Sequence, residues 1–381
     1  MKSTACEMFG IEFPLFAFTH CRDVVVEVSK AGGLGVLGAV AISSPEQLEI
    51  ELKWIDEHID GMPYGVDLIV PAKFETQRGQ ETGKKTFDRV PQTHKDFVRE
   101  LLTRYDIDPE VASEDRLSRG TVIGDNMVDS GARAMLDVAF AHPIRTIVNA
   151  LGPPPSFMLE RAKSEGVPVG ALVGTRDHAV RQAEAGVDIL IASGGEAGGH
   201  CGEISTLVLV PEVVEAMRAY DDLPVLAAGG IATGGQMAAC MAMGAAGAWT
   251  GSVWLTTTEA ETSPVVKEKI LAAGARDTIR SRSRTGKHSR QLRSDWTDAW
   301  EAEDAPTPLP MPLQSIVSEP ILRRLEKLAE GGHGGARELV SYFVGQGVGL
   351  MNKSVGARWV VQDFMEEFAD AHDRLHHLMS D

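Results

Sequence analysis

Cysteine is scarce in this sequence, and the four cysteines that it has lie far apart. Cys6, Cys21, Cys201 and Cys240 show neither the CxxC spacing of a zinc site nor the pattern of a disulfide framework. We therefore expect no disulfides and no metal site. Unpaired cysteines are typical of proteins in the reducing cytoplasm, which is the location we predict.

Long hydrophobic runs are missing as well. The N-terminal residues MKSTACEMFGIEFPLFAF lack the apolar stretch of a cleavable signal, and no run of 18 apolar residues occurs anywhere in the chain. The sequence therefore predicts an untargeted, soluble protein with no membrane partner.

Positive charge is in short supply. The chain has 37 Lys and Arg against 54 Asp and Glu, which gives a formal net charge of −17 at pH 7. Proteins that bind nucleic acids neutralise phosphates with a basic surface, and anionic membranes attract the same kind of surface. We expect neither partner, which leaves a small-molecule substrate.

Aromatic residues make up only 6% of the chain, whereas hydrophobic residues reach 43% and glycine occurs 39 times. This composition is typical of short strands, tight turns and small packing residues. Short hydrophobic runs alternate with helical patterns, as in a parallel sheet built from βαβ units. We predict a TIM (β/α)8 barrel, with strands near residues 14–18, 35–37, 65–70, 145–149, 167–173, 187–192, 223–228 and 246–250.

Local signals mark several helix boundaries. Ser44 can cap a helix that starts at Pro45, and Gln47 completes a capping box. Further along, Pro211 is predicted to open a helix and Gly244 to end another. The helix that starts at Pro45 has one apolar stripe, formed by Leu48, Leu52 and Ile55.

Two segments interrupt the barrel pattern. Residues 72–127 are too long for a loop, so we predict a partly helical insertion after the third strand, with a lid as its hypothetical role. Residues 1–260 are predicted to form the barrel, and residues 261–381 a mostly helical extension that packs on it. The basic run RSRSRTGKHSRQLR (280–293) is predicted to be a solvated surface. The residues expected to pack on the barrel, or on a second subunit in a homodimer, are Trp359, Phe364 and Phe368.

The stretch AGGLGVLG contains Gly33-x-Gly35-x-x-Gly38, the letters of a dinucleotide-binding fingerprint. That fingerprint needs a strand before it and a helix that opens within it. Here a helix over 22–30 precedes the glycines, and the next helix starts only at Ser44. We therefore interpret them as a helix stop, a short strand and a loop at the barrel mouth.

A second glycine cluster, LAAGGIATGG (226–235), follows the seventh predicted strand, and Gly251-Ser252 follows the eighth. Barrels commonly bind phosphate on these two loops, where glycine amides approach closely and a helix N-terminus adds partial positive charge. Tight packing alone would also require glycine. The two adjacent loops together favour a phosphorylated cofactor.

The sixth predicted strand leads into SGGEAGGHCGEIST (193–206). Glycine and polar residues are poor core material, but they allow the backbone to approach a ligand. His200 stands in this loop at the carboxyl end of a barrel strand, where catalytic residues gather. It can act as a base or as a cation that stabilises a substrate anion.

Taken jointly, GGEAGGHCG, AAGGIATGGQMAACMAMGA, AGGLGVLGA and the later GQGVGLMNKS resemble the nitronate monooxygenases, also called 2-nitropropane dioxygenases. The resemblance covers most of the barrel and is shared with the flavin-dependent enoyl-thioester reductases. It implies an oxidoreductase with flavin mononucleotide (FMN) as cofactor and dioxygen as acceptor. His200 would take the α-proton of a nitroalkane or support its anion.

The same resemblance implies a set of cofactor-binding residues. The flavin ring would lie against the first strand, its phosphate on the two glycine loops, and a glutamine near the C-terminus close to both. Three of these residues depart from the family pattern, because Phe18 replaces a methionine, Asp67 an asparagine and Ser193 a glutamine. Asp67 would place a negative charge beside the flavin unless it is protonated or paired. The full set is Ala17, Phe18, Thr19, Asp67, Ser193, Gly194, Gly199, Gly229, Gly230, Gly251, Ser252 and Gln346.

Three functions stay open at this point. The first is an FMN-dependent nitronate monooxygenase with His200 as catalytic base. The second is a flavin reductase of enoyl thioesters or quinones that takes electrons from NADH or NADPH. The third is a non-catalytic binder of a phosphorylated ligand, against which the histidine loop argues.

Overall fold

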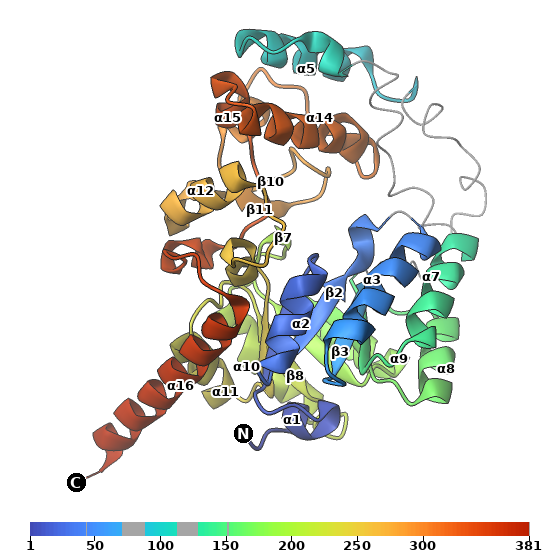
Figure 1. Ribbon diagram of the computed structural model, residues 1–381, viewed down its shortest axis with the longest axis vertical. Helices are drawn as coiled ribbons and strands as arrows, with labels where there is room; N and C mark the ends of the chain where they lie inside the picture. Colours follow the sequence, from blue (N-terminus) through green and yellow to red (C-terminus); the bar gives the residue numbers. More distant parts are fainter. Residues whose placement is uncertain (43, 71–87, 113–128, 151, 381) are drawn as a thin grey trace.

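The chain folds around a closed barrel of parallel strands (Figure 1). The structure, a computed structural model, describes residues 1–42, 44–70, 88–112, 129–150 and 152–380. Neighbouring strands follow the order β1-β2-β3-β4-β5-β6-β8-β9, and β9 pairs with β1 to close the ring. The predicted (β/α)8 barrel is confirmed. Its strands are β1 (Leu15–Thr19), β2 (Leu34–Gly38), β3 (Tyr64–Leu68), β4 (Thr146–Asn149), β5 (Val169–Val173), β6 (Ile189–Ser193), β8 (Val225–Ala228) and β9 (Gly247–Thr250).

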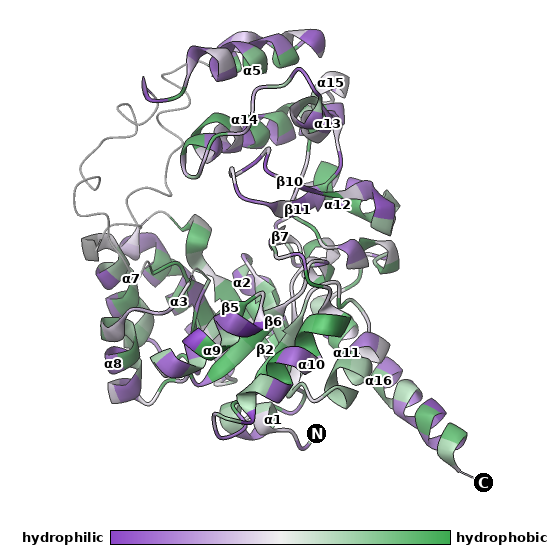
Figure 2. Ribbon diagram, turned by 180° about the vertical axis from the view of Figure 1, so that it is seen from behind, coloured by the Kyte–Doolittle hydropathy of each residue, from purple (hydrophilic) through white to green (hydrophobic). Residues whose placement is uncertain are grey.

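Helices cover the outside of the barrel, and hydrophobic residues gather on its strands (Figure 2). In α3 (Pro45–His58), Ser44 caps the helix by accepting the amide of Gln47 over 3.3 Å, and the predicted apolar stripe is buried. Gln47 does not complete a capping box, because its side chain donates to Glu51 over 2.8 Å. The other helices of this layer are α2 (Arg22–Lys30), α7 (Asp129–Ala141), α8 (Ser156–Glu165), α9 (Arg176–Ala185), α10 (Thr206–Met217) and α11 (Gly234–Ala242). A further helix, α1 (Thr4–Phe9), packs against the interior of the barrel, and the short η1 (Ala39–Ala41) and η5 (Ser252–Thr256) follow β2 and β9.

The prediction that Pro211 opens a helix is wrong, because Pro211 lies inside α10. The helix begins at Thr206, whose amide nitrogen and hydroxyl group both donate to the carboxylate of Glu196 over 2.9 Å. A carboxylate at a helix N-terminus satisfies amides that have no partner within the helix. This anchor fixes the start of α10 before the proline is reached.

The stretch AGGLGVLG contains the end of a helix and a short strand, as predicted. α2 precedes β2, and no helix opens within the run. A Cβ atom added at Gly35 would collide with the carbonyl oxygen of Val25 in α2. The strand therefore lies against the backbone of this helix, at a distance that only glycine permits.

A second lobe has its own hydrophobic core and lies above the barrel in Figure 1. It consists of residues 88–112 and 264–351, because α5 (Gln92–Arg104) from the predicted insertion shares a core with the segment that follows the barrel. The rest of the insertion, residues 72–87 and 113–127, lies outside the described residues. The hypothesis that the insertion acts as a lid therefore concerns mostly residues that the structure does not describe. The other elements of the lobe are η2 (Pro109–Ala112), α12 (Pro264–Ala272), η6 (Ala275–Asp277), β10 (Thr278–Ser281), β11 (Ser289–Leu292), α13 (Asp295–Glu301), α14 (Leu313–Glu330), α15 (Gly334–Leu339) and η7 (Gln346–Leu350).

The prediction that residues 280–293 form a solvated surface is wrong. They form the antiparallel strands β10 and β11 with the turn between them, and much of the run is buried. Arg284 pairs twice with Glu319, over 2.7 Å from Nε and 3.1 Å from Nη2. Its guanidinium carbon also lies 4.1 Å from the centre of the Phe343 ring. The local charge pattern could not show this, because Glu319 lies 35 residues further along the chain.

The C-terminal helix α16 (Ala357–Met379) packs against α11 and α2, and its far end projects away from the barrel (Figure 1). Phe364 is buried in this contact and Phe368 packs against the same core, as predicted. Trp359 is instead 58% exposed. Among the described helices, α16 included, none combines the length and hydropathy needed to cross a bilayer.

Substitution of Gly234 should test the packing of α16 on α11. A Cβ atom at Gly234 would collide with the carbonyl oxygen of Phe364, whereas one at the neighbouring Gly235 meets nothing within 4 Å. We expect Gly234→Ala to lower the free energy of unfolding by about 1–3 kcal/mol through overpacking. Gly235→Ala is the matched control and should leave stability unchanged or slightly higher. Urea unfolding of both variants measures this, and equal stabilities would contradict the packing described.

Candidate active site

The loop after β6 carries His200 and is held by the second lobe. Its short strand β7 (Gly199–His200) pairs antiparallel with β11, which places Ser289 opposite His200. Arg290 donates from Nε to the carbonyl oxygen of Gly195 over 2.9 Å. The basic run of the sequence thus fixes the backbone of the histidine loop at the carboxyl end of the barrel.

The imidazole of His200 has one hydrogen-bond partner among the described residues. Its Nε2 lies 2.8 Å from the hydroxyl oxygen of Thr285, on the turn between β10 and β11. The ring keeps an accessible surface, yet loss of hydration lowers its pKa, and the positive charge of Lys287 lowers it further. The imidazole is therefore neutral near pH 7 and able to accept a proton. Sequence analysis missed Thr285, since the pairing of β7 with β11 has no local signal.

The glycine loops after β8 and β9 present unpaired amides. Gly229 and Gly230 have φ angles of 108° and 68°, which only glycine adopts without strain. A Cβ atom at Gly229 would also lie 2.7 Å from the hydroxyl oxygen of Thr206. In the described part of the chain, no acceptor binds the amide nitrogens of Gly229, Gly230, Gly251 or Ser252. Amides without acceptors on two adjacent loops suit a phosphate group.

A third loop, residues 345–347 near the C-terminus, packs against the loops after β8 and β9. Gly345 donates its amide to Ser252 Oγ over 2.8 Å, and the amide of Gln346 donates to the carbonyl oxygen of Glu196 over 2.9 Å. A Cβ atom at Gly347 would lie 2.6 Å from the carbonyl oxygen of Gly230. The structure therefore brings Gln346 to the histidine loop and to both glycine loops.

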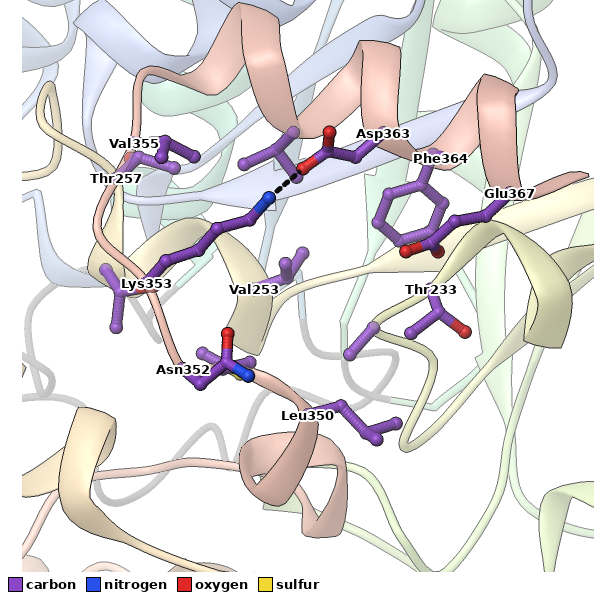
Figure 3. A pocket seen from close by; sticks show the side chains of 14 residues that line it. Thr233, Val253, Thr257, Leu350, Asn352, Lys353, Val355, Asp363, Phe364 and Glu367 are labelled. Carbon is purple, nitrogen blue, oxygen red and sulfur yellow. Dashed lines mark hydrogen bonds and ion pairs between the residues drawn. The ribbon is translucent and has the colours of Figure 1, made fainter.

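The N-terminus of α11 is not free to hold a phosphate group. The amide of Gly234 donates to the carboxylate of Glu367 over 2.7 Å, and Thr233 caps the helix by accepting the amide of Gln236. The pocket beside this helix end is lined by acidic side chains as well, with Asp363 paired to Lys353 over 2.5 Å (Figure 3). The expected contribution of a helix N-terminus is therefore wrong for α11, and the loop amides are the remaining donors.

The residues predicted on β1 divide between two faces. Ala17 is buried in the core between strands and helices, and Thr19 Oγ1 accepts the amide of Cys21 over 3.1 Å. Of these residues only Phe18 packs with the barrel interior, where its ring centre lies 6.0 Å from that of Trp249 with the ring planes 26° apart. His20, which the sequence reasoning missed, follows β1 directly and lies 2.6 Å from the carbonyl oxygen of Gly38 through Nδ1. Loss of hydration lowers the pKa of His20, although the hydrogen bond to Gly38 opposes this effect.

Asp67 is the most unusual group at the barrel mouth. It lies near the carboxyl end of β3, 1% exposed, and its Oδ1 has no partner among the described residues. Its neighbours in the barrel are Gly38 of β2 and Val148 of β4, neither of which carries a charge. Burial alone raises the pKa of this carboxyl well above its usual range. Burial therefore favours the protonated form of Asp67, and in that form the carboxyl can donate a hydrogen bond.

The remaining predicted residues belong to the histidine loop. Ser193 ends β6 and is half-buried, and Gly194 donates its amide to the carbonyl oxygen of Ala228 over 2.9 Å. Gly199 has a φ of 76° with open space around it. These residues shape the loop, and Gly194 ties it to the loop after β8.

Comparison with known proteins agrees with this architecture. Residues 2–367 match the family model described as nitronate monooxygenase. A Mycobacterium tuberculosis protein, Rv1533, named as a monooxygenase, is 52% identical over 381 residues and is covered in full, as is this chain.

Solved structures show the same fold. The nitroalkane oxidase from Streptomyces ansochromogenes superposes with a TM-score of 0.78 at 25% identity, over 98% of this chain and 100% of that one. The enoyl reductase domain of MlnA from Bacillus amyloliquefaciens gives a TM-score of 0.65 at 17% identity, over 99% and 98% of the two chains. At that identity the second likeness shows the fold alone.

Replacing Asp67 with asparagine should change how stability depends on pH. At low pH the carboxyl is protonated in both the folded and the unfolded chain. Above its ordinary pKa the unfolded chain releases the proton while the folded chain keeps it. The free energy of unfolding then falls by up to about 1.4 kcal/mol per pH unit until the raised pKa is reached.

Thermal unfolding of the flavin-free Asp67→Asn variant should therefore show a gain in Tm over the wild type that grows with pH. The exposed Asp177 provides the control, and Asp177→Asn should show no such growth. A difference in Tm between Asp67→Asn and the wild type that stays constant from low to neutral pH would contradict a protonated Asp67.

Proposed function

Because the chain belongs to the nitronate monooxygenase family and is an oxidoreductase, we propose that it oxidises alkyl nitronates with dioxygen, using FMN as cofactor. The observation that carries this proposal is the neutral imidazole of His200, on a loop that packs against the loop after β8, whose amides lack acceptors. A base such as His200 and amides that can bind an anion, both at the carboxyl end of the barrel strands, suit proton abstraction beside a phosphorylated cofactor.

The residues at the mouth fit FMN. The amides of Gly229, Gly230, Gly251 and Ser252 would hold its phosphate group, and the Phe18 ring offers an apolar wall for the flavin ring. Asp67 Oδ1 has no partner in the described part of the chain, and a protonated Asp67 has a hydroxyl group that can donate a hydrogen bond. The carbonyl oxygens and ring nitrogens of a flavin can accept such a hydrogen bond. When bound, FMN supplies the electron transfer between substrate and dioxygen.

His200 moves the proton in this proposal. With a nitroalkane, the neutral ring accepts the α-proton and becomes a cation, which then stabilises the nitronate anion beside it. With a nitronate supplied directly, no α-proton needs to move, and only the stabilisation of the anion remains.

A second candidate is a reductase of enoyl thioesters or quinones, with NADH or NADPH as electron donor. The likeness to an enoyl reductase domain supports it as far as the fold goes. The same barrel and the same histidine would serve, with His200 donating a proton to the reduced substrate.

We also place the protein in the cytoplasm as a homodimer formed through α16. All four cysteines are free, as in a reducing compartment. The projecting end of α16 exposes Leu375, Leu378 and Met379, which are 52%, 78% and 88% exposed. Sedimentation velocity should give a dimer, and a monomer at micromolar concentration would remove this part of the proposal.

The His200→Asn variant tests the base. We expect it to retain flavin and to lose about 10²- to 10⁴-fold in kcat/KM for a nitroalkane, the usual size of a general-base effect. The loss with the preformed nitronate should be smaller, because the proton transfer is already complete. His372→Asn, on the exposed part of α16, is the control and should keep wild-type rates. Wild-type rates in a flavin-loaded His200→Asn variant would refute the role of His200.

Anaerobic stopped-flow spectra separate the two candidate reactions. Under the main proposal, propionate 3-nitronate bleaches the flavin rapidly, whereas NADH and NADPH leave it oxidised. Rapid bleaching by a nicotinamide alone would make the protein a reductase and leave its electron acceptor as the next question.

A further inference from the structure

The turn between β10 and β11 holds Thr285 against the catalytic loop. Gly286 follows it with a φ of 83°, and a Cβ atom there would collide with the carbonyl oxygen of Leu309. Thr285 itself is buried, with 6% exposure. The antiparallel pairing of β11 with β7 carries the turn to His200. These contacts fix the position of the Thr285 side chain beside His200.

The hydrogen bonds of Thr285 can be counted. Its hydroxyl oxygen lies 3.2 Å from the carbonyl oxygen of Lys287, 3.3 Å from the amide nitrogen of Lys287 and 2.8 Å from His200 Nε2. A hydroxyl group has one proton to donate and two lone pairs to accept with. The carbonyl oxygen can only accept, and the amide can only donate. If the hydroxyl proton goes to the carbonyl oxygen, the remaining lone pair must accept a proton from His200.

We propose that Thr285 is a positioning residue that accepts the Nε2–H of His200 and so leaves Nδ1 as the atom that takes the substrate proton. This inference rests on the proposed role of His200 as base. Nδ1 has no partner among the described residues, which is what a base that awaits substrate requires.

Loss of hydration and the charge of Lys287 together favour the neutral ring of His200. Lys287, two residues beyond Thr285, lowers the pKa of His200, and Glu319 opposes it from the second lobe. Loss of hydration is the largest of these influences, and Glu319 is also paired with Arg284. A neutral ring has a single N–H, and Thr285 decides which nitrogen carries it.

The hydrogen bond predicts a tautomer that nitrogen NMR can read. In the oxidised, flavin-loaded enzyme labelled with ¹⁵N-histidine, the His200 resonances should show a protonated Nε2 and an unprotonated Nδ1. A protonated Nδ1 in the wild type would mean that Thr285 donates to the ring, and it would overturn the proposal. This readout does not depend on any reaction of the flavin.

Three variants test the positioning role. Thr285→Val has the same shape without the hydroxyl group, and it should lower the His200 pKa measured by NMR, because a charged ring loses more from a missing acceptor than a neutral one. We expect kcat/KM for a nitroalkane to fall by about tenfold, the usual value of one hydrogen bond, with little change for the preformed nitronate. Thr285→Ser should restore both. Thr297→Val, which removes a buried hydroxyl elsewhere in the lobe, should change neither.

The outcomes separate this inference from the proposed function. If Thr285→Val keeps both the wild-type His200 pKa and the wild-type nitroalkane rate, Thr285 has no positioning role. If the NMR results are as expected but His200→Asn still turns over nitroalkanes at the wild-type rate, the hydrogen bond is real and the proposed base is wrong.

Discussion

Close approach of backbone to backbone at the barrel mouth is the constraint on which the site depends. The histidine loop, the loop after β8 and the C-terminal loop meet where a Cβ atom would strike another main chain. A Cβ atom added at Gly198 would touch the backbone of Val344, and one added at Gly347 would touch the backbone of Gly230. The amides of Gly229 and Gly230 in this cluster have no acceptor among the described residues, and the histidine loop that carries His200 packs beside them.

The second lobe contributes as much to this arrangement as the barrel does. It supplies β11, to which the histidine strand pairs, and the buried ion pair of Arg284 with Glu319 beneath it. A buried pair of charges is weak evidence for stability, since its desolvation cost is large. Here it explains how Arg284 of a basic segment can be buried, directly before Thr285 in the turn.

The sequence allowed the barrel, its strands and the order of its loops to be predicted, because each depends on local periodicity and on glycine at strand ends. Three of the errors share one cause. The start of α10 is set by Glu196, the N-terminus of α11 is occupied by Glu367, and the basic run is buried against Glu319. Each depends on a carboxylate outside the local segment, at separations of 10, 133 and 35 residues, which no local pattern reports. His20 and Thr285 were missed in the same way, because their partners come from other strands.

The central claim is that the amides of the two glycine loops hold the phosphate group of FMN. The most direct test is to denature the purified protein after reconstitution and to identify the released chromophore by chromatography and mass spectrometry. We predict FMN at one equivalent per chain. A released FAD, or a protein that binds no flavin, would contradict the claim, because neither outcome is compatible with a mononucleotide phosphate on these loops.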